Sequence, residues 1–234
     1  MSDDVGLYEG LLTTRAIRRF TDEPVSDDDL QAILFAATRA PSGSNRQPFR
    51  FVVLRDGPVA REARAALGRA ARLAWQGKET TDGYRDGSGA EADSPKARMA
   101  RTMQRFVDRF ETTPVIVLAC LKRYRDPAIG EGASVYPACQ NLLLAARARG
   151  LGGVMTQWHA LVEPELRTIL GVPDGVGMHA TISLGHPEGR HGPVRRRPMA
   201  ELVYEDRWEG PAAWAVDPDG AGFTRAGPPG TWAD

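Results

Sequence analysis

The 234-residue chain has no surplus of charge of either sign, because Lys+Arg and Asp+Glu both number 30. It therefore lacks the overall basic field that attracts nucleic acid or an anionic membrane. Cysteine is scarce, and Cys120 and Cys139 lie in apolar stretches without CxxC spacing, which predicts buried thiols rather than a zinc site. No apolar run is long enough to span a membrane, and the acidic first residues lack the apolar segment of a signal peptide. We expect a cytoplasmic protein that binds neither nucleic acid nor membranes.

Several motifs that carry chemistry are also missing. The sequence has no GxxxxGK[ST] phosphate loop, no GxGxxG between a strand and a helix, and no GxSxG nucleophile elbow. The histidines lack metal-ligand spacing, so we expect no metal centre; they are His159, His179, His186 and His191. Any anion site must come from local clusters of arginine.

The hydrophobic pattern predicts one α+β domain, a sheet covered by helices, without an internal repeat or a linker. We expect helices at 5–13, from the N-cap Ser26 to Pro41, and at 59–75, 96–110, 134–150 and 164–171. Strands are expected at 49–54, 114–120, 152–158 and 178–184. The continuous apolar run at 114–120 is typical of a strand buried on both faces.

Two segments break this pattern. Residues 77–95 are rich in Gly, Asp, Thr, Ser and Glu, and a loop of that length predicts a mobile lid or a disordered segment. Tyr84, Arg85 and Lys96 are candidates for substrate contact there, with solvated loop residues as the alternative. The tail, 205–234, has no helical or strand period and contains Trp208, Trp214 and Trp232. We expect it to lie on another surface, including that of a partner subunit.

Two arginine clusters and one small-residue loop remain as candidates for chemistry. Arg15, Arg18 and Arg19 form the first cluster; Arg195, Arg196 and Arg197 form the second. Arginine binds phosphate bidentately and stays charged. Either cluster alone predicts a solvated surface. Together with the 41–48 loop, whose Ser42, Gly43 and Ser44 amides could line a ring edge, they predict a phosphorylated planar ligand.

Five ordered motifs resemble those of the nitroreductase family of FMN enzymes. Residues 13–25 (TTRAIRRFTDEPV) resemble its N-terminal signature, and 40–49 (APSGSNRQPF) its second. Residues 140–146 with 150–152 match the third pattern of the family. Residues 184–187 (LGHP) and 196–198 (RRP) match its C-terminal pattern. The match spans 8–204. The PSGS form of the second motif is similar to the branch that contains iodotyrosine deiodinases and flavin-fragmenting enzymes.

The resemblance implies a nitroreductase-like fold, with a mainly antiparallel sheet flanked by helices, and an intertwined homodimer with two FMN sites at the interface. Thr14, Arg15 and Ala16 match the positions that contact the flavin phosphate, and Arg18 the position at the N1/O2 edge of the ring. Thr14 stands where the family commonly has Arg, and Ala16 stands where it commonly has Ser. These departures shift the phosphate contact towards Arg15 and Arg196.

Further positions carry over in the same way. Pro41, Ser42, Gly43, Ser44 and Asn45 would line the flavin from the partner subunit. Met155, Thr156 and Gln157 match the segment that faces flavin N5, and Trp158 either walls the cavity or packs in the core. Arg196 matches the C-terminal phosphate ligand, with Arg195 and Arg197 beside it.

The implied function is reduction of nitroaromatic, quinone or related aromatic acceptors, with NADH or NADPH as reductant, by ping-pong hydride transfer. The flavin carries the hydride, so no catalytic side chain is assigned. The alternatives are specialised chemistry on the same scaffold, such as reductive dehalogenation, flavin fragmentation or a biosynthetic oxidation, and a flavin-binding protein without turnover.

Overall fold

The computed structural model describes residues 5–223. Their contacts divide the chain into two compact units, 1–191 and 192–234, and each unit is described by itself. The first unit contains every α-helix and strand of the described residues.

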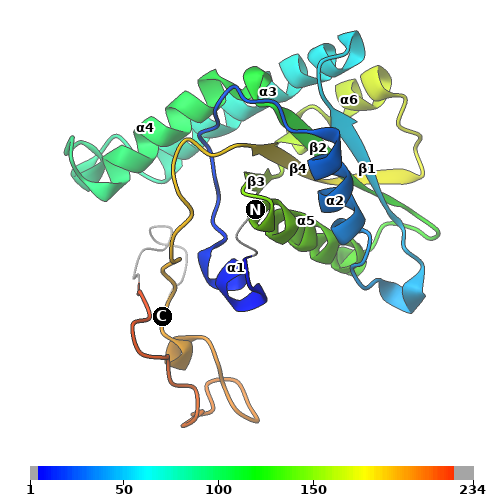
Figure 1. The fold of residues 1–234 in the computed structure, drawn as a ribbon. Helices are drawn as coiled ribbons and strands as arrows, with labels where there is room; N and C mark the ends of the chain where they lie inside the picture. The colour runs from blue at the N-terminus through cyan, green and yellow to red at the C-terminus, as the bar shows by residue number, and fades with distance from the viewer. Residues whose placement is uncertain (1–4, 224–234) are drawn as a thin grey trace. The chain divides into compact units, whose positions relative to one another are not determined.

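A four-stranded antiparallel sheet in the order β1-β2-β4-β3 forms the centre of the first unit (Figure 1). The strands are β1 (Phe49–Leu54), β2 (Val115–Lys122), β3 (Gly152–Thr156) and β4 (Val176–Gly185). This sheet and its helices confirm the predicted α+β, nitroreductase-like fold.

The helices are α1 (Leu7–Thr13), α2 (Asp27–Ala37), α3 (Pro58–Thr81), α4 (Pro95–Asp108), α5 (Tyr136–Ala148) and α6 (Glu163–Leu170). Ser26 caps α2 as predicted, because its hydroxyl oxygen accepts the Asp29 N–H at 3.0 Å. Gly171 ends α6 in the left-handed region, at φ 63°.

Strand β2 is buried on both faces, as its continuous apolar sequence predicts. Side chains of a strand alternate between the two faces of the sheet. One set, Ile116, Leu118 and Cys120, joins the core under α3, α4 and α6, whereas the other set, Val115, Val117, Ala119 and Leu121, joins the core under α2 and α5. Figure 1 shows these helices on the two sides of the sheet.

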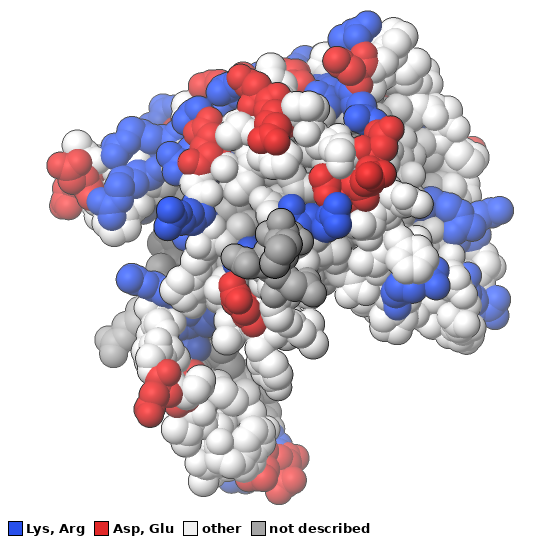
Figure 2. Space-filling view, in the orientation of Figure 1, with Lys and Arg blue, Asp and Glu red and all other residues white. Residues whose placement is uncertain are grey.

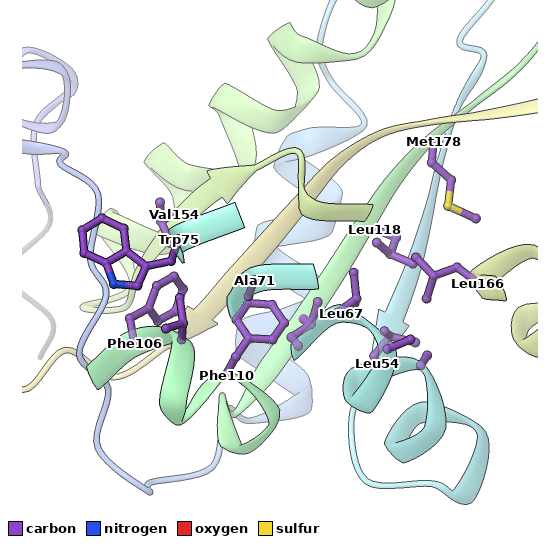
Figure 3. Close-up of a cluster of buried hydrophobic side chains, with 14 of the residues drawn as sticks. Leu54, Leu67, Ala71, Trp75, Phe106, Phe110, Leu118, Val154, Leu166 and Met178 are labelled. Atoms are coloured by element: carbon purple, nitrogen blue, oxygen red, sulfur yellow. The ribbon is translucent and has the colours of Figure 1, made fainter. Parts of the chain in front are cut away.

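The core under α3 and α4 is rich in aromatic side chains. In Figure 3, Trp75 and Phe106 lie at the left of this cluster and Leu118 and Leu166 at the right. The Trp75 indole N–H donates to Gln104 Oε1 at 3.0 Å, which satisfies the one polar atom of this side chain. The core therefore ties α3 to α4 through well-packed rings.

Arg64 is the only buried arginine of the described residues, at 7% exposed. Its guanidinium donates to the carbonyls of Leu54, Glu111 and Pro114 at 2.9 to 3.0 Å. Burial lowers its pKa. These bonds join α3 to the end of β1 and the start of β2.

Helix α3 extends beyond the predicted end at residue 75, so part of the expected loop at 77–95 is helical. Lys78 and Asp82 form an i, i+4 ion pair, and the Thr81 hydroxyl donates to the Gly77 carbonyl at 3.2 Å. Together with the start of α4 at Pro95, this confines the non-α-helical segment to 82–94. The mobility of that segment stays a prediction.

The second unit contains one short 3₁₀ turn, Met199–Glu201, among its described residues. Trp214 Nε1 donates to Glu205 Oε1 at 3.0 Å, and the Tyr204 and Trp208 rings meet at 5.1 Å. Both tryptophans are largely exposed, and the prediction for Trp232 lies outside the described residues.

The surface carries mixed charge. Figure 2 shows basic and acidic side chains interspersed over α3 and α4 on the face in view, in agreement with a net charge of zero. Within residues 5–223, no helix is both long and apolar enough to cross a membrane.

The segment before Phe20 docks against the start of β3, where the first two residues are glycines. The Ile17 N–H donates to the Gly153 carbonyl at 2.9 Å, and Ala16 forms a parallel bridge with Gly153. A Cβ added at Gly152 would lie 2.6 Å from Ile17 Cγ1, and one at Gly153 would lie 2.6 Å from the Ser183 carbonyl oxygen. Glycine at 152 therefore allows the close approach of the docked segment, and glycine at 153 allows β3 to pack closely on β4.

We predict that Gly153→Ala lowers the free energy of unfolding by about 1–3 kcal/mol, because the added methyl overpacks a rigid backbone contact. Urea denaturation measures the loss. Gly77→Ala is the matched control: its Cβ would meet nothing within 4 Å in the helix interior, so it should be neutral or stabilising. Equal stability of Gly153→Ala and the wild type would contradict the described packing.

Candidate functional site

Five arginines line one cavity of about 320 Å³ in the first unit. Arg15, Arg18 and Arg19 come from the segment docked on β3, Arg98 from the first turn of α4, and Arg190 from the chain after β4. No acidic side chain lines this cavity. Its charge therefore suits an anionic ligand.

Arg18 is half-buried, and no carboxylate of the described residues forms an ion pair with it. Burial lowers its pKa, the nearby Arg15 charge lowers it further, and Tyr84 opposes the change. A cation held partly out of water without a partner is destabilising unless a ligand supplies the negative charge.

Thr14 adds a second unsatisfied group next to this cavity. Its hydroxyl oxygen is buried and has no hydrogen-bond partner among the described residues. Buried polar atoms are nearly always hydrogen-bonded, so an exception calls for an explanation. The predicted phosphate contacts Arg15 and Ala16 and the predicted ring contact Arg18 thus meet in one cavity, with Thr14 adjoining it.

The loop at 41–45 lines a different cavity, of about 310 Å³, through Pro41, Ser42 and Gly43. Ser44 and Asn45 adopt left-handed φ values of 51° and 50°. Non-glycine residues in this region are uncommon and cluster at functional sites. The Ser42 hydroxyl holds the turn by accepting the Gln47 N–H at 2.8 Å.

A charged cluster forms the far wall of the same cavity. Arg123 donates to both carboxylate oxygens of Glu131, at 3.0 and 2.7 Å. The Arg123 hydrogen bond lowers the pKa of Glu131 and raises that of Arg123. His179 Nε2 lies 3.3 Å from Glu131 Oε1, but burial lowers the His179 pKa. No sequence motif indicated this cluster, because only the fold brings His179 of β4 to the Arg123–Glu131 pair.

The two segments predicted to hold the flavin, the arginine segment docked on β3 and the 41–48 loop, join the sheet at opposite corners. Gly153 pairs with Leu184, and Leu184 with Val115, level with the C-terminal end of β1. The 41–48 loop joins β1 at its other end, Phe49. Three strand spacings of about 4.8 Å and five residues of about 3.3 Å rise separate them by roughly 20 Å. Within one chain, the two segments therefore join the sheet at well-separated points.

The predicted N5 segment straddles the end of β3. Met155 is 42% exposed, the Thr156 hydroxyl donates to the Thr181 carbonyl at 3.3 Å, and Gln157 Nε2 donates to the Tyr136 hydroxyl at 3.2 Å. Trp158 packs against the rings of Phe106 and Phe110, with centroids 5.5 and 5.4 Å away. Of its two predicted roles, this geometry favours core packing.

The predicted substrate contacts of the 82–94 segment differ in their surroundings. The Tyr84 ring packs at a tilt against Trp75, with ring centres 5.1 Å apart, and Lys96 Nζ lies 5.5 Å from the centre of the Tyr84 ring. Arg85 is exposed and pairs with Glu79 at 2.8 Å. Tyr84 also lies close enough to Arg18 to affect its pKa. Of these two residues, Tyr84 is therefore the better candidate for ligand contact.

The C-terminal cluster belongs to the second unit. The Arg196 N–H donates to the Gly222 carbonyl at 3.3 Å, and Arg197 lies 3.7 Å from Glu201. Their role as phosphate ligands, with Arg195 beside them, stays a prediction.

Arg98 and Arg190 are cavity residues that the sequence motifs do not include. Arg98 belongs to a helix with two other arginines, Arg101 and Arg105, and Arg109 follows the end of that helix. Only the fold distinguishes it, since Pro95, Arg98, Met99 and Thr102 share the face that lines the cavity.

The family model described as nitroreductase matches residues 11–186. The chain belongs to the nitroreductase family. An NADH dehydrogenase of Thermus thermophilus is 31% identical over 204 residues, which cover 82% of this chain and 92% of the relative. A nitrobenzene nitroreductase of Ectopseudomonas oleovorans is 31% identical over 192 residues, or 73% of this chain and 82% of the relative.

Solved structures agree with this membership. A Desulfovibrio desulfuricans chain described as a nitroreductase in complex with FMN is 28% identical, with a TM-score of 0.62 over 86% of this chain and 96% of that one. The Vibrio harveyi NADPH:FMN oxidoreductase, complexed with NAD+, is 25% identical, with a TM-score of 0.61 over 86% and 77%. At the level of the family, these likenesses support an FMN-type oxidoreductase.

The predicted branch is also represented. A 5,6-dimethylbenzimidazole synthase of Rhodospirillum rubrum is 27% identical over 76% of this chain and 80% of the relative. Rat iodotyrosine deiodinase 1 is 27% identical over 77% of this chain and 61% of the relative.

We predict that inorganic phosphate stabilises the flavin-free protein through Arg15 and Arg18. At ten times its Kd, phosphate should add about 1.4 kcal/mol to the free energy of unfolding, measured by urea denaturation. The double variant Arg15→Gln/Arg18→Gln should lose this gain. Arg39→Gln, a control on an exposed arginine of another surface, should keep it. An equal gain in all three proteins would show a general salt effect and contradict a built anion site.

Proposed function

We propose that the protein is an FMN-dependent oxidoreductase that uses NADH or NADPH to reduce nitroaromatic, quinone or related aromatic acceptors. The observation that carries this proposal is the arginine-lined cavity, in which Arg18 is half-buried and without a carboxylate partner among the described residues. The names of the relatives, nitrobenzene nitroreductase and NADPH:FMN oxidoreductase, support the reaction class.

The residues present fit the anionic cofactor. A phosphate carries close to two negative charges and accepts several hydrogen bonds, which suits Arg15 and the orphaned Thr14 hydroxyl. Arg18 would then face the N1/O2 edge of the ring, where its charge would stabilise negative charge that develops there. When bound, FMN supplies the hydride chemistry, whereas the protein supplies orientation and electrostatics.

We further propose that each site is completed by a second copy of the chain. The separation of roughly 20 Å between the β3-docked segment and the 41–45 loop supports this proposal, because a ring that contacts both segments would then meet loops from two chains. Exposed apolar side chains offer surface for such an association. They include Leu7, Tyr8, Leu11 and Leu12 on α1, and Trp208 and Trp214 in the second unit.

The second candidate is specialised chemistry on the same scaffold, either reductive dehalogenation or flavin fragmentation. The similarity to the deiodinase and the dimethylbenzimidazole synthase favours it. Specificity of this kind would be set by the 82–94 segment, where Tyr84 lies near Arg18.

We predict that the purified protein binds FMN, and that anaerobic NADH or NADPH bleaches its absorption. Arg18→Gln should reduce kcat/KM for a nitroarene by about 100-fold, because it removes a charge at the developing anion. Stopped-flow spectroscopy and steady-state assays measure both effects. Bound flavin that neither nucleotide reduces would indicate a binding protein. Reduction without turnover of any nitroarene or quinone would favour the specialised chemistry.

We predict that two inactive variants complement each other if the site is shared between chains. Arg15→Gln/Arg18→Gln damages the cavity on β3, and Gly43→Val damages the other loop. Refolded together at equal amounts, they should regain about a quarter of wild-type activity, because half of the symmetric dimers are mixed and each mixed dimer has one intact site. Each variant refolded alone is the control, and no recovery in the mixture would argue for a site within one chain.

A further inference from the structure

The cavity on β3 contains more positive charge than a flavin phosphate neutralises. Five guanidinium groups line it, whereas a phosphate monoester carries about two negative charges at neutral pH. The sequence motifs assign Arg15 and Arg18 to the flavin, and Arg98 and Arg190 remain without a role.

The five cavity arginines share a lack of ion pairs with described residues. Of the 21 other arginines within residues 5–223, eleven form ion pairs with Asp or Glu. None of the five cavity arginines forms one with a described residue, and Arg98 donates only to the Asp93 carbonyl. In a chain of zero net charge, this is a concentrated positive field.

Helix α4 directs this field into the cavity. Pro95, Arg98, Met99 and Thr102 have the i, i+3, i+4, i+7 spacing of one helix face, and all four line the cavity. Arg98 lies in the first turn of this 14-residue helix, where the partial positive charge of the N-terminus adds to its own. Arg190 contributes a guanidinium from the chain after β4.

We propose that Arg98 and Arg190 form a second anion subsite, distinct from the flavin phosphate contacts, for a carboxylate or phosphate group of the redox partner. The subsite rests on the proposed function, since it lies in the same cavity as Arg15 and Arg18. It selects anionic ligands: a carboxylated aromatic acceptor, or the nicotinamide donor that bears the extra 2′-phosphate. Met99 supplies an apolar surface beside the two charges.

The test measures binding to the oxidised FMN-loaded protein by calorimetry, without turnover. Two probe pairs each differ in one anionic group: benzoate against benzamide, and NADP+ against NAD+. The wild type should prefer the anionic member of at least one pair. The variant Arg98→Gln/Arg190→Gln should weaken the binding of that member about tenfold, which is the effect expected for the loss of one charge-assisted contact. Affinity for the neutral member or for NAD+ should stay the same. Arg101→Gln is the matched control, because it removes a charge from α4 without lining the cavity.

The outcomes separate the subsite from the flavin site. A selective loss for benzoate assigns the subsite to the acceptor, and a selective loss for NADP+ assigns it to the donor. No anionic preference in the wild type, or an equal loss in Arg101→Gln, overturns the proposal. A fall in FMN affinity with unchanged probe binding assigns both arginines to the flavin phosphate and also overturns it. Failure of the wild type to bind FMN at all overturns the proposed function and the subsite with it.

Discussion

The hydrogen bond from the Ile17 amide to the Gly153 carbonyl holds the N-terminal segment against the edge of the sheet, at 2.9 Å. Gly152 permits this contact because a Cβ there would lie 2.6 Å from Ile17 Cγ1, whereas Gly153 permits β3 to pack closely on β4, where its Cβ would lie 2.6 Å from the Ser183 carbonyl oxygen. Arg15 precedes this contact in the chain, and Arg18 and Arg19 follow it. All three reach one cavity because the backbone between them is docked on β3.

Charge distribution connects this geometry with function. The ion pairs of residues 5–223 lie outside the cavity, and the cavity arginines have no described carboxylate partner. Arg18 is held partly out of water near Arg15, which lowers its pKa and opposes folding. A loss of folding stability at a few residues is characteristic of ligand-binding sites in the absence of the ligand, because stability and function compete at the same residues.

Much of the fold could be predicted from sequence, since periodicity reports burial. The two-faced burial of β2 and the Ser26 cap follow from local patterns. The end of α3 could not, because Lys78 and Asp82 stabilise a polar turn that composition assigns to a loop. For the site, the motifs identified Arg15 and Arg18 but missed Arg98, because a sequence does not show which arginines lack partners. The distance between the two flavin motifs depends on strand register, which no motif encodes.

The central claim is that one flavin is held by the β3-docked arginines of one chain and the 41–45 loop of another. A crystal structure of the FMN-bound protein tests it most directly. The account predicts a flavin phosphate within hydrogen-bonding distance of Arg15 and a ring edge at Arg18, with Ser42 and Gly43 of a second copy against the same ring. A flavin bound by both segments of a single chain, or bound away from Arg15 and Arg18, would contradict it.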